Sequence, residues 1–364
     1  MNSLEEARKT INEVDAKMAE LFSVRMRAAE VVARHKKEHG LKILDATREA
    51  EVIRRNSALV EDKILREYYV KFIENCMSLS RAYQERLLSG MKVAYSGTKG
   101  AFAHIATNAL FPSAQKKACS DFASAYEAVA LGECDVAVLP VENSSNGDVG
   151  QVTDLLFSGS LYVNSMLNLE VTQDLLGIPG AALADIKEVI SHPQALGQCA
   201  DYLSDKGFVQ HEYANTALAA KKVAEMGDKS VAAIASAQAA ELFGLCVLEK
   251  NINKSKNNTT RFAVLSRSDN TYPESENGVH TILMFTVRNE AGALAKSIDI
   301  IGKHGFNMRS LHSRPMKELL WEYYFYVELE GNIHTDNGAK MLEELKTTCD
   351  KLKTAGTFKE EVAV

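Results

Sequence analysis

Asn257-Asn258-Thr259-Thr260-Arg261-Phe262 is the stretch around which this chain is organised. A loop rich in lysine and asparagine precedes it, and the apolar run 262–265 follows it. A short apolar run of this kind is typical of a buried strand. The stretch therefore places two hydroxyls and a guanidinium at the mouth of a strand, where ligand-binding groups gather in α/β folds. On residue types alone, a polar turn entering a strand is the simpler interpretation.

Two more polar loops follow predicted buried strands. Residues 135–140 lead to Asn143-Ser144, and residues 188–190 lead to Ser191-His192-Pro193-Gln194, with Gln198 in the next helix. The strand–helix alternation predicts an α/β fold with largely parallel sheets. Together with Thr-Arg-Phe, these motifs resemble the prephenate dehydratases. The resemblance implies that residues 91–270 form two periplasmic-binding-protein-like lobes around a cleft, with Ser-His-Pro-Gln in the second lobe and the other two motifs in the first.

Prephenate loses a ring hydroxyl and a carboxylate as its ring becomes aromatic. The resemblance implies that Thr260 is the catalytic hydroxyl that aids departure, its proton being drawn through a hydrogen-bond network. Arg261 is expected to bind a substrate carboxylate. His192 could be the acid, but its place before Pro193 favours a structural role. No metal or organic cofactor is expected. The other predicted substrate contacts are Asn143, Ser144, Ser191, Gln198 and Thr259.

Residues 1–90 read as a separate helical module. They contain no proline and only two glycines, Gly40 and Gly90, which favours long helices. Apolar residues form a heptad seam from Leu4 to Val32. A helix to about Lys37 would be roughly 50 Å long, too long to bury its seam within so small a module. A partner chain is therefore the simplest cover. Arg25 occupies a seam position, where it must meet an anion, either a ligand or an internal ion pair.

A set of polar residues in this module resembles the AroQ-type chorismate mutases: Arg8, Arg25, Lys36, Asp45, Arg48, Glu49, Ser80 and Gln84. The resemblance implies an intertwined all-helical dimer in which Arg8 reaches the partner's site. Chorismate is a dicarboxylate that rearranges without covalent help, so the enzyme must hold a compact conformer and stabilise developing charge.

Each member of this set has an expected role. The three arginines suit the carboxylates because their forks bind in a bidentate manner. Lys36 and Gln84 are expected to bond the ether oxygen. Glu49 and Asp45 would hold the hydroxyl side, with support from Ser80. The predicted catalytic residues are Lys36, Gln84 and Glu49.

A third block follows a polar, turn-rich linker at residues 269–278. Strands are predicted at 280–287, 307–313 and 321–330, with helices at 292–304 and from about 338. This βαββα order resembles an ACT domain over residues 279–360, which implies a βαββαβ ferredoxin-like fold. A glycine at the start of a helix lets backbone amides approach a bound amino acid. The residues that resemble the phenylalanine-binding motifs of dehydratase ACT domains are Asn289, Gly292, Ala293, Leu294, Ser313 and Arg314.

This block also departs from the pattern it resembles. His312 stands where the family usually has an acid, which affects the expected affinity for phenylalanine or its pH dependence. A purely structural module that pairs chains is the alternative interpretation.

Composition excludes several classes of protein. The net charge of −6 argues against a nucleic-acid surface. No apolar run approaches the roughly 18 residues of a membrane span. The N-terminus begins with a charged helix rather than a signal peptide. The six cysteines are scattered, as expected for reduced thiols in a cytoplasmic protein.

By these three resemblances the chain is identified as a member of the bifunctional chorismate mutase/prephenate dehydratases. The expected activities convert chorismate to prephenate and then to phenylpyruvate, with feedback inhibition by phenylalanine in a homodimer or higher oligomer. One alternative is a dehydratase whose mutase-like arm is inactive and serves only dimerisation. The other is a two-lobed small-molecule regulator, which predicts closure on a ligand without turnover.

Overall fold

The computed structural model describes residues 3–254, 258–316 and 322–362, the last three by their backbone alone. Asn257 of the quoted stretch and Trp321 of a predicted strand lie outside the described residues. The chain forms two compact units that join between Lys92 and Val93, and a short piece, Ser113–Gln115, also belongs to the first. Within the described ranges, no helix is both long and apolar enough to cross a membrane.

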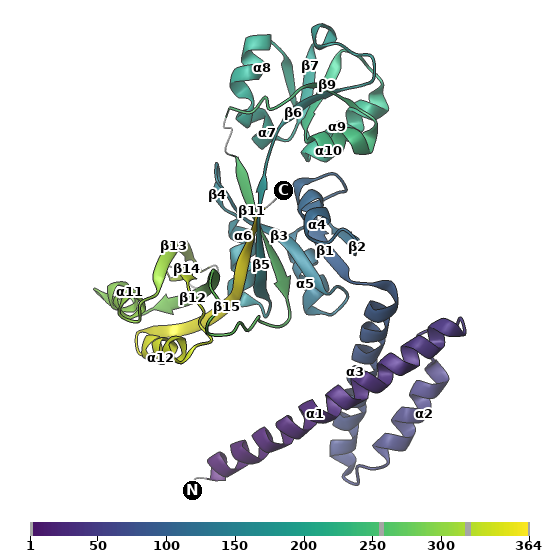
Figure 1. Ribbon diagram of the computed structural model, residues 1–364, viewed down its shortest axis with the longest axis vertical. Helices are drawn as coiled ribbons and strands as arrows, with labels where there is room; N and C mark the ends of the chain where they lie inside the picture. Colours follow the sequence, from purple (N-terminus) through teal and green to yellow (C-terminus); the bar gives the residue numbers. More distant parts are fainter. Residues whose placement is uncertain (1–2, 255–257, 317–321, 363–364) are drawn as a thin grey trace. The chain divides into compact units, whose positions relative to one another are not determined.

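The first unit consists of helices. They are α1 (Ser3–Glu38), α2 (Ala46–Ser57) and α3 (Lys63–Ser89) (Figure 1). Both α1 and α2 pack on α3. Asp45 caps α2 by accepting a hydrogen bond of 3.0 Å from the backbone N–H of Arg48. The heptad seam of α1 stays open in the single chain: Leu4, Ile11, Val14, Met18, Leu21 and Val32 are 42–67% exposed.

The second unit begins with an α/β lobe. Its elements are β1 (Lys92–Ser96), α4 (Phe102–Leu110), β2 (Gln115–Cys119), α5 (Phe122–Ala130), β3 (Val136–Asn143), β4 (Gly147–Asp148), α6 (Gly150–Ser158), β5 (Tyr162–Glu170) and β11 (Thr259–Ser266). Apolar side chains of β3, β5 and β11 pack with those of α5 and α6 in one core. The motifs Asn143-Ser144 and Thr-Arg-Phe therefore belong to the same lobe, as predicted.

The second lobe is a sheet in the order β10-β6-β9-β7-β8. Helices cover both faces, with α7 and α8 on one and α9 and α10 on the other (Figure 1). Ser-His-Pro-Gln joins β7 to α7 in this lobe, as predicted. The elements are β6 (Asp174–Gly177), η1 (Leu183–Asp185), β7 (Glu188–Ser191), α7 (Pro193–Gln198), α8 (Ala200–Lys206), β8 (Val209–Glu212), α9 (Thr216–Met226), β9 (Val231–Ala235), α10 (Ala237–Phe243) and β10 (Cys246–Glu249).

Both sheets are mixed rather than largely parallel, which corrects the sequence prediction. β1 and β3 run parallel, as do β7, β8 and β9. β11 runs antiparallel to β3 and β5, and β6 runs antiparallel to β9 and β10. β6 and β11 are the strands that the chain enters on crossing from one lobe to the other. Each therefore starts where its antiparallel neighbours end.

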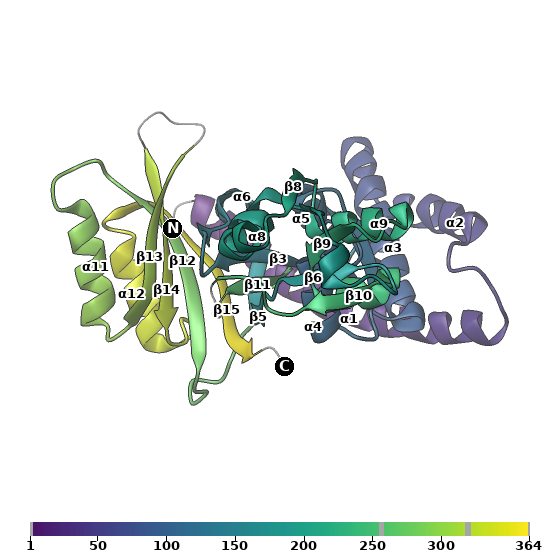
Figure 2. The ribbon, with the colours of Figure 1, turned by 90° about the horizontal axis from the view of Figure 1, so that it is seen from above.

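The C-terminal part of the second unit has the predicted βαββαβ order. Its elements are β12 (Val279–Val287), α11 (Ala293–Lys303), β13 (Asn307–Pro315), β14 (Tyr323–Glu330), α12 (Asp336–Leu345) and β15 (Cys349–Val362). Helices α11 and α12 lie on one side of the sheet (Figure 2), against residues such as Leu283 and Val327. The alternate residues, including Met284 and Tyr326, join the core of the first lobe. The end of β15 pairs with β5, so this sheet continues into the sheet of the first lobe.

Candidate active sites

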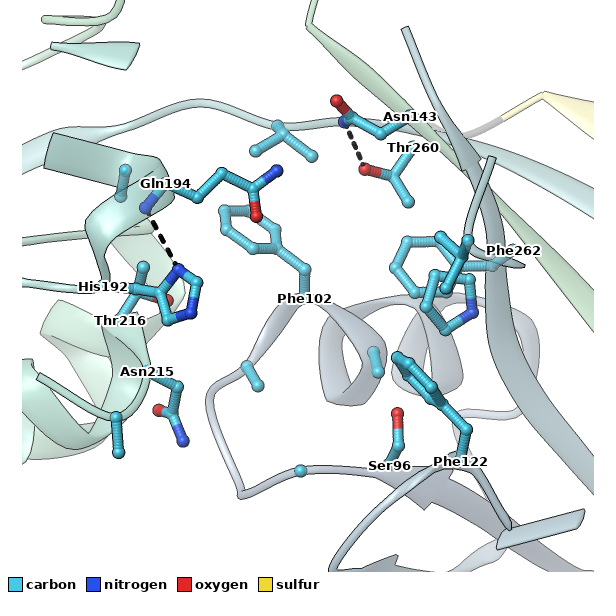
Figure 3. Close-up of a pocket in the computed structure, with 18 of the residues that line it drawn as sticks. Ser96, Phe102, Phe122, Asn143, His192, Gln194, Asn215, Thr216, Thr260 and Phe262 are labelled. Atoms are coloured by element: carbon cyan, nitrogen blue, oxygen red, sulfur yellow. Dashed lines mark hydrogen bonds between the residues drawn. The ribbon is translucent and has the colours of Figure 1, made fainter. Parts of the chain in front are cut away.

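A cavity of about 610 Å³ lies between the two lobes of the second unit. Thr260, Asn143, Phe262 and Phe102 line it from the first lobe, while His192, Gln194 and Asn215 line it from the second (Figure 3). Thr260 and Phe262 alternate with Arg261 along β11, so both reach the same face of the strand.

Thr260 and Asn143 are direct neighbours across β11 and β3. The Asn143 side-chain amide donates a hydrogen bond of 2.9 Å to the Thr260 hydroxyl oxygen (Figure 3). Because the oxygen of Thr260 accepts this bond, the hydroxyl proton remains available to a second acceptor. Thr260 is 8% exposed and lines the cavity. The sequence motif therefore places a hydroxyl donor in this cavity.

Arg261 does not line the cavity, which corrects its predicted role. Strand alternation turns it to the other face of β11, where its guanidinium makes a bidentate pair with Glu328 of β14, at 2.8 and 3.1 Å. Glu142 lies 3.3 Å from the same guanidinium. The Glu328 carboxylate is fully buried. Arg261 therefore joins the first lobe to the C-terminal sheet.

Arg261→Ala is expected to lower the free energy of unfolding by about 3 kcal/mol, because it removes the bidentate partner of a buried carboxylate. His280 and Arg309, each 3.6 Å from Glu328, limit the loss. Urea denaturation monitored by circular dichroism measures it. Adding Glu328→Gln to the variant should recover part of the stability, because the charge left unpaired is removed. A destabilisation below about 0.5 kcal/mol, the range of ordinary surface substitutions, would contradict this account.

The other predicted dehydratase residues divide between the cavity and its support. Gln198 lines the cavity. Ser191 is fully buried, does not line the cavity and donates to the backbone oxygen of Ile234 at 2.7 Å. Ser144 accepts the backbone N–H of Thr259 at 3.0 Å, and neither residue lines the cavity. The side chains of Ser191 and Ser144 thus bond to backbone groups at strand ends. His192 lines the cavity and also caps α7 by accepting the N–H of Gln194 at 3.2 Å (Figure 3).

Several helices start at this cavity, a feature that was not predicted from the sequence. Residues at the N-termini of α4, α5, α6, α7 and α9 all contribute to its wall. Asp121 and Asn215 cap α5 and α9 with their side chains, whereas α4 and α6 begin without a side-chain cap. Hydrogen bonds from Ser124 hold the pKa of Asp121 below its usual value. Of the described residues that line the cavity, none is lysine or arginine.

The helical unit contains a cavity of about 170 Å³. Seven of the eight residues predicted for the mutase site line it: Arg25, Lys36, Asp45, Arg48, Glu49, Ser80 and Gln84. Arg25 donates to the Ser80 hydroxyl and, at 3.0 Å, to the backbone oxygen of Cys76. Lys36 donates to the backbone oxygen of Ile43. Arg8 is exposed on α1 and does not line this cavity.

Arg81 is a member of this site that the sequence reasoning missed. It also lines the cavity and forms an ion pair with Glu49. The helical spacing of Met77, Ser80, Arg81 and Gln84 would have revealed it, since these positions share one face of α3. Ser80 and Gln84 are each 6% exposed, so the polar residues on this face of α3 are buried.

A third cavity, of about 550 Å³, lies at the start of α11. The predicted residues Asn289, Gly292, Ala293 and Leu294 line it. Charged and apolar groups complete the wall: Arg288, Glu290 and Asp350, with Ile298 and Phe325. Gly292 is the N-cap of α11, with φ of 82° and no side-chain cap. The cavity thus combines a helix N-terminus, carboxylates and an apolar surface.

Ser313 and Arg314 do not line this third cavity, which corrects their predicted place. Arg314 extends from β13 to α6, where its Nε lies 3.1 Å from Asp154. Tyr324 donates to the same carboxylate at 2.7 Å, and burial raises the pKa of Tyr324 to about 12. His312 lies 3.1 Å from Asp148, in the strand before α6. This part of β13 therefore binds the segment that carries the N-terminus of α6 to the cavity between the two lobes.

Helix α6 is held by the C-terminal sheet at its other end as well. Phe157 of α6 stacks on Tyr324 with ring centroids 4.2 Å apart. Lys353 of β15 donates to the backbone oxygens of Leu156 and Gly159, where α6 ends. Burial and the charge of Lys351 lower the pKa of Lys353 to about 8. The C-terminal sheet thus contacts both ends of a helix that starts at the cavity between the lobes.

Comparison with known proteins agrees with this division of the chain. Residues 7–85 match the family "Chorismate mutase type II", and residues 93–270 match the family "Prephenate dehydratase". A solved prephenate dehydratase from Arthrobacter aurescens, in complex with L-Phe, has a TM-score of 0.68 and 26% identity, over 74% of this chain and 90% of that one. A structure described as GqqA, a novel type of quorum quenching acylase, has a TM-score of 0.68 and 33% identity, over 74% of this chain and 98% of that one.

One relative extends over all three parts of the chain. It is a bifunctional chorismate mutase/prephenate dehydratase from Enterobacter agglomerans, 31% identical over 100% of this chain and 97% of its own length. The chain matches a mutase family and a dehydratase family in the order found in this relative. These matches argue against the alternative of a two-lobed regulator without turnover. The chain therefore belongs to the family of bifunctional chorismate mutase/prephenate dehydratases.

Proposed function

We propose that Thr260 is the acid that protonates the departing ring hydroxyl of prephenate. The observation that carries the proposal is the 2.9 Å bond from the Asn143 amide to the Thr260 oxygen, which leaves the hydroxyl proton for the substrate. In the reaction the C–OH bond breaks as water leaves, the bond to the ring carboxylate supplies its electron pair to the ring, and CO₂ departs. Phenylpyruvate, water and CO₂ are then the products of prephenate and one proton.

The two substrate carboxylates would bind at the two helix starts that no side chain caps. Helices α4 and α6, each of nine residues, open toward the cavity through Ala101-Phe102 and Val149. Unsatisfied N–H groups and the helix dipole favour an anion there. This arrangement accounts for dicarboxylate binding although Arg261 points elsewhere. Gln198 would supply a further polar contact to a substrate oxygen, while Asn143 would act by orienting Thr260.

In the helical unit, the clustered cations define the mutase site. Arg25 and Arg48 would bind the carboxylates of chorismate, and Lys36 with Gln84 the ether oxygen that gains charge as its bond breaks. The Oε1 atom of Gln84 is buried, and no described residue hydrogen-bonds to it. Glu49, held by Arg81, would face the hydroxyl side with Asp45. Arg8 would enter from a second chain, because the exposed seam of α1 suits an intertwined homodimer.

Val279–Val362 would act as an ACT-type regulatory domain that binds phenylalanine in the cavity at the start of α11. The uncapped helix start suits the carboxylate of an amino acid, and Glu290 or Asp350 suits its ammonium group. Leu294, Ile298 and Phe325 would contact the ring. Inhibition requires phenylalanine to favour a less active arrangement. Helix α6 would transmit such a change to the dehydratase cavity. Strands β13, β14 and β15 contact this helix, and its start lines the cavity.

Gly292→Val should abolish inhibition by phenylalanine and leave both activities within about twofold, because Gly292 lines the cavity at α11 and neither of the two cavities proposed for the substrates. The φ of 82° at Gly292 is unfavourable for a β-branched residue, so the start of α11 would shift and lose its aligned N–H groups. Dehydratase rates at increasing phenylalanine concentrations measure the effect. Gly302→Ala is the matched control, since a Cβ at that helical position meets no atom within 4 Å. Inhibition that persists in Gly292→Val would place the effector elsewhere.

A chorismate feed tests the whole proposal in one experiment. Purified protein is given chorismate, and prephenate and phenylpyruvate are followed by absorbance with and without phenylalanine. Phenylpyruvate that forms, and falls when phenylalanine is present, is the expected result. Prephenate alone would mean that the cleft between the lobes does not react. If neither product appears, prephenate is supplied directly, and phenylpyruvate formed then would identify an inactive mutase arm.

A further inference from the structure

Five side chains beside the dehydratase cavity form one continuous hydrogen-bonded chain. Asn143 Nδ2 donates to Thr260 Oγ1 and to Asn258 Oδ1, both at 2.9 Å. Asn258 Nδ2 in turn donates to Gln198 Oε1 at 3.1 Å. Gln173 Nε2 donates to the same oxygen of Gln198 at 3.3 Å. Asn258 and Gln173 were not among the predicted site residues.

The direction of every bond in this amide chain follows from one backbone anchor. Asn143 Oδ1 accepts the backbone N–H groups of Ser145 at 3.0 Å and Asn146 at 3.1 Å. Backbone N–H groups can only donate, so Nδ2 of Asn143 must face Thr260 and Asn258. Asn258 then presents its oxygen to Asn143 and its nitrogen to Gln198. The oxygen and nitrogen of an amide are usually assigned from such networks, and here the anchor leaves one assignment.

Asn258 stands where the amide chain passes between the lobes. It directly precedes β11, on one of the two crossings of the main chain, and its backbone oxygen accepts the N–H of Val171 at 2.7 Å on the other crossing. Gln173 lies on that second crossing, and Gln198 ends α7 in the second lobe. The Asn258 side chain is thus the described link between Asn143 in the first lobe and Gln198 in the second. Asn258 is 1% exposed.

We propose that Asn258 is a positioning residue of the dehydratase: it keeps Asn143 Nδ2 directed at Thr260, so that Thr260 acts as a proton donor, and it passes the polarity set at Asn143 on to Gln198. The proposal rests on the function proposed above for Thr260. An amide at position 258 is needed for two opposite tasks, since it must accept from Asn143 and donate to Gln198. A side chain that can only accept would repel Gln198 Oε1 and draw Asn143 Nδ2 away from Thr260.

The polarity of the amide chain also determines how the amide of Gln173, at the far end of the chain, is oriented. Gln173 is 3% exposed and lines the cavity, and no described residue hydrogen-bonds to its buried Oε1. Because Gln173 Nε2 donates to Gln198, Gln173 Oε1 remains as an acceptor for the ligand. Prephenate carries one hydroxyl that can donate to it. If the amide of Gln198 flips so that Nε2 donates to an acceptor at position 258, the amide of Gln173 must flip as well. Gln173 then presents its NH₂ group to the cavity instead of its oxygen.

Asn258→Asp tests the proposal, because it keeps the shape and replaces the NH₂ donor with a carboxylate oxygen that can only accept. At pH 8 we expect kcat for prephenate about 100-fold below that of the wild type, with KM within about threefold, as for loss of an interaction made in the transition state. When the introduced carboxyl group is protonated, it donates to Gln198 as asparagine does, and burial favours this protonated form. The deficit in kcat should therefore shrink to about tenfold or less at pH 5. Asn258→Ala, which cannot regain a donor, should show the same deficit at both pH values.

The pH comparison uses the ratio of variant to wild type, so that groups present in both proteins cancel. These groups are His192 and Asp121, which line the cavity, and Glu142 on β3 beside Asn143. Among the described residues, the side chains hydrogen-bonded to Asn258 are Asn143, Ser145 and Gln198, all uncharged. A new titration in the ratio therefore reports on the carboxyl group introduced at position 258.

Two further variants act as controls in the full-length protein. Ser145→Ala removes a hydroxyl 3.5 Å from Asn258 Oδ1 but keeps the backbone anchor, and should leave kcat within about twofold, as expected of an exposed side chain. Gln198→Glu makes the same amide-to-carboxylate change where the amide oxygen only accepts, so its kcat at pH 8 should exceed that of Asn258→Asp by about tenfold. Melting temperatures, measured on the same samples, show whether the second unit of each variant is folded.

Three results would overturn the proposal. Wild-type kcat in Asn258→Asp at pH 8 would show that the donor is not needed. Equal deficits in Asn258→Asp and Asn258→Ala at every pH would show that size and not polarity matters. Equal losses in Gln198→Glu and Asn258→Asp would point to added charge alone. Thr260→Ala separates this failure from that of the proposed function, because an active Thr260→Ala enzyme would refute the role of Thr260 itself.

Discussion

Replacing Thr260 by alanine is expected to lower kcat for prephenate dehydration about 10³-fold, within the range that general acid catalysis contributes. The reduction corresponds to about 4 kcal/mol of transition-state stabilisation. The variant keeps the backbone of β11 and loses the γ-methyl group together with the hydroxyl that Asn143 orients. Thr260→Ser should retain most of the activity, because it keeps the hydroxyl. Rates are measured by formation of phenylpyruvate from supplied prephenate.

Thr259→Ala is the matched control for this experiment. Thr259 is the neighbouring threonine on the same strand, and its side chain does not line the cavity. Its backbone N–H, which binds Ser144, is unchanged by the substitution. We expect kcat within about threefold of the wild type, as for other substitutions away from a site. Equal loss of mutase and dehydratase activity in Thr260→Ala would reveal general damage to the fold. More than a tenth of the wild-type kcat would mean that another group supplies the proton.

Lys36→Ala is expected to produce the reverse pattern, with chorismate mutase activity lowered by about 10² to 10³, the typical loss when one preorganised donor to developing charge is removed. Lys36 lines the helical cavity with Arg25 and Gln84. Its ammonium would face the ether oxygen of chorismate. Dehydration of supplied prephenate should be unchanged, since that reaction takes place in the other unit. The mutase rate is measured by the disappearance of chorismate.

Lys37→Ala serves as the control because Lys37 is the next residue on α1, carries the same charge and is exposed. Its mutase activity should stay within about twofold of the wild type. Lys36 also holds the backbone oxygen of Ile43, so the melting temperature of the variant is measured in parallel. A normal mutase rate in Lys36→Ala would remove Lys36 from the site. Loss of both activities in step with a lower melting temperature would mean that the lysine acts through stability.

Much of this protein follows from local patterns in its sequence. The heptad seam and the lack of proline determine the long helix α1, and the carboxylate of Asp45 caps the start of α2. Short apolar runs determine the strands that carry the dehydratase motifs at their ends. The polar positions of the mutase site could be predicted because helical periodicity fixes which residues share a face. Family resemblance added the reactions, which periodicity alone does not give.

The tertiary structure decided which of the predicted polar residues face a cavity. Thr260 and Arg261 are adjacent in sequence, yet strand alternation sends one to the cavity and the other to Glu328, 67 residues further along the chain. Arg314 likewise binds Asp154 of α6 rather than the cavity at α11. Asn258 and Gln173 become part of the site only because two crossings of the chain bring their amides to Gln198. A local pattern fixes a residue's face on its own element, but the partner on that face comes from distant chain segments, and a single sequence does not specify that pairing.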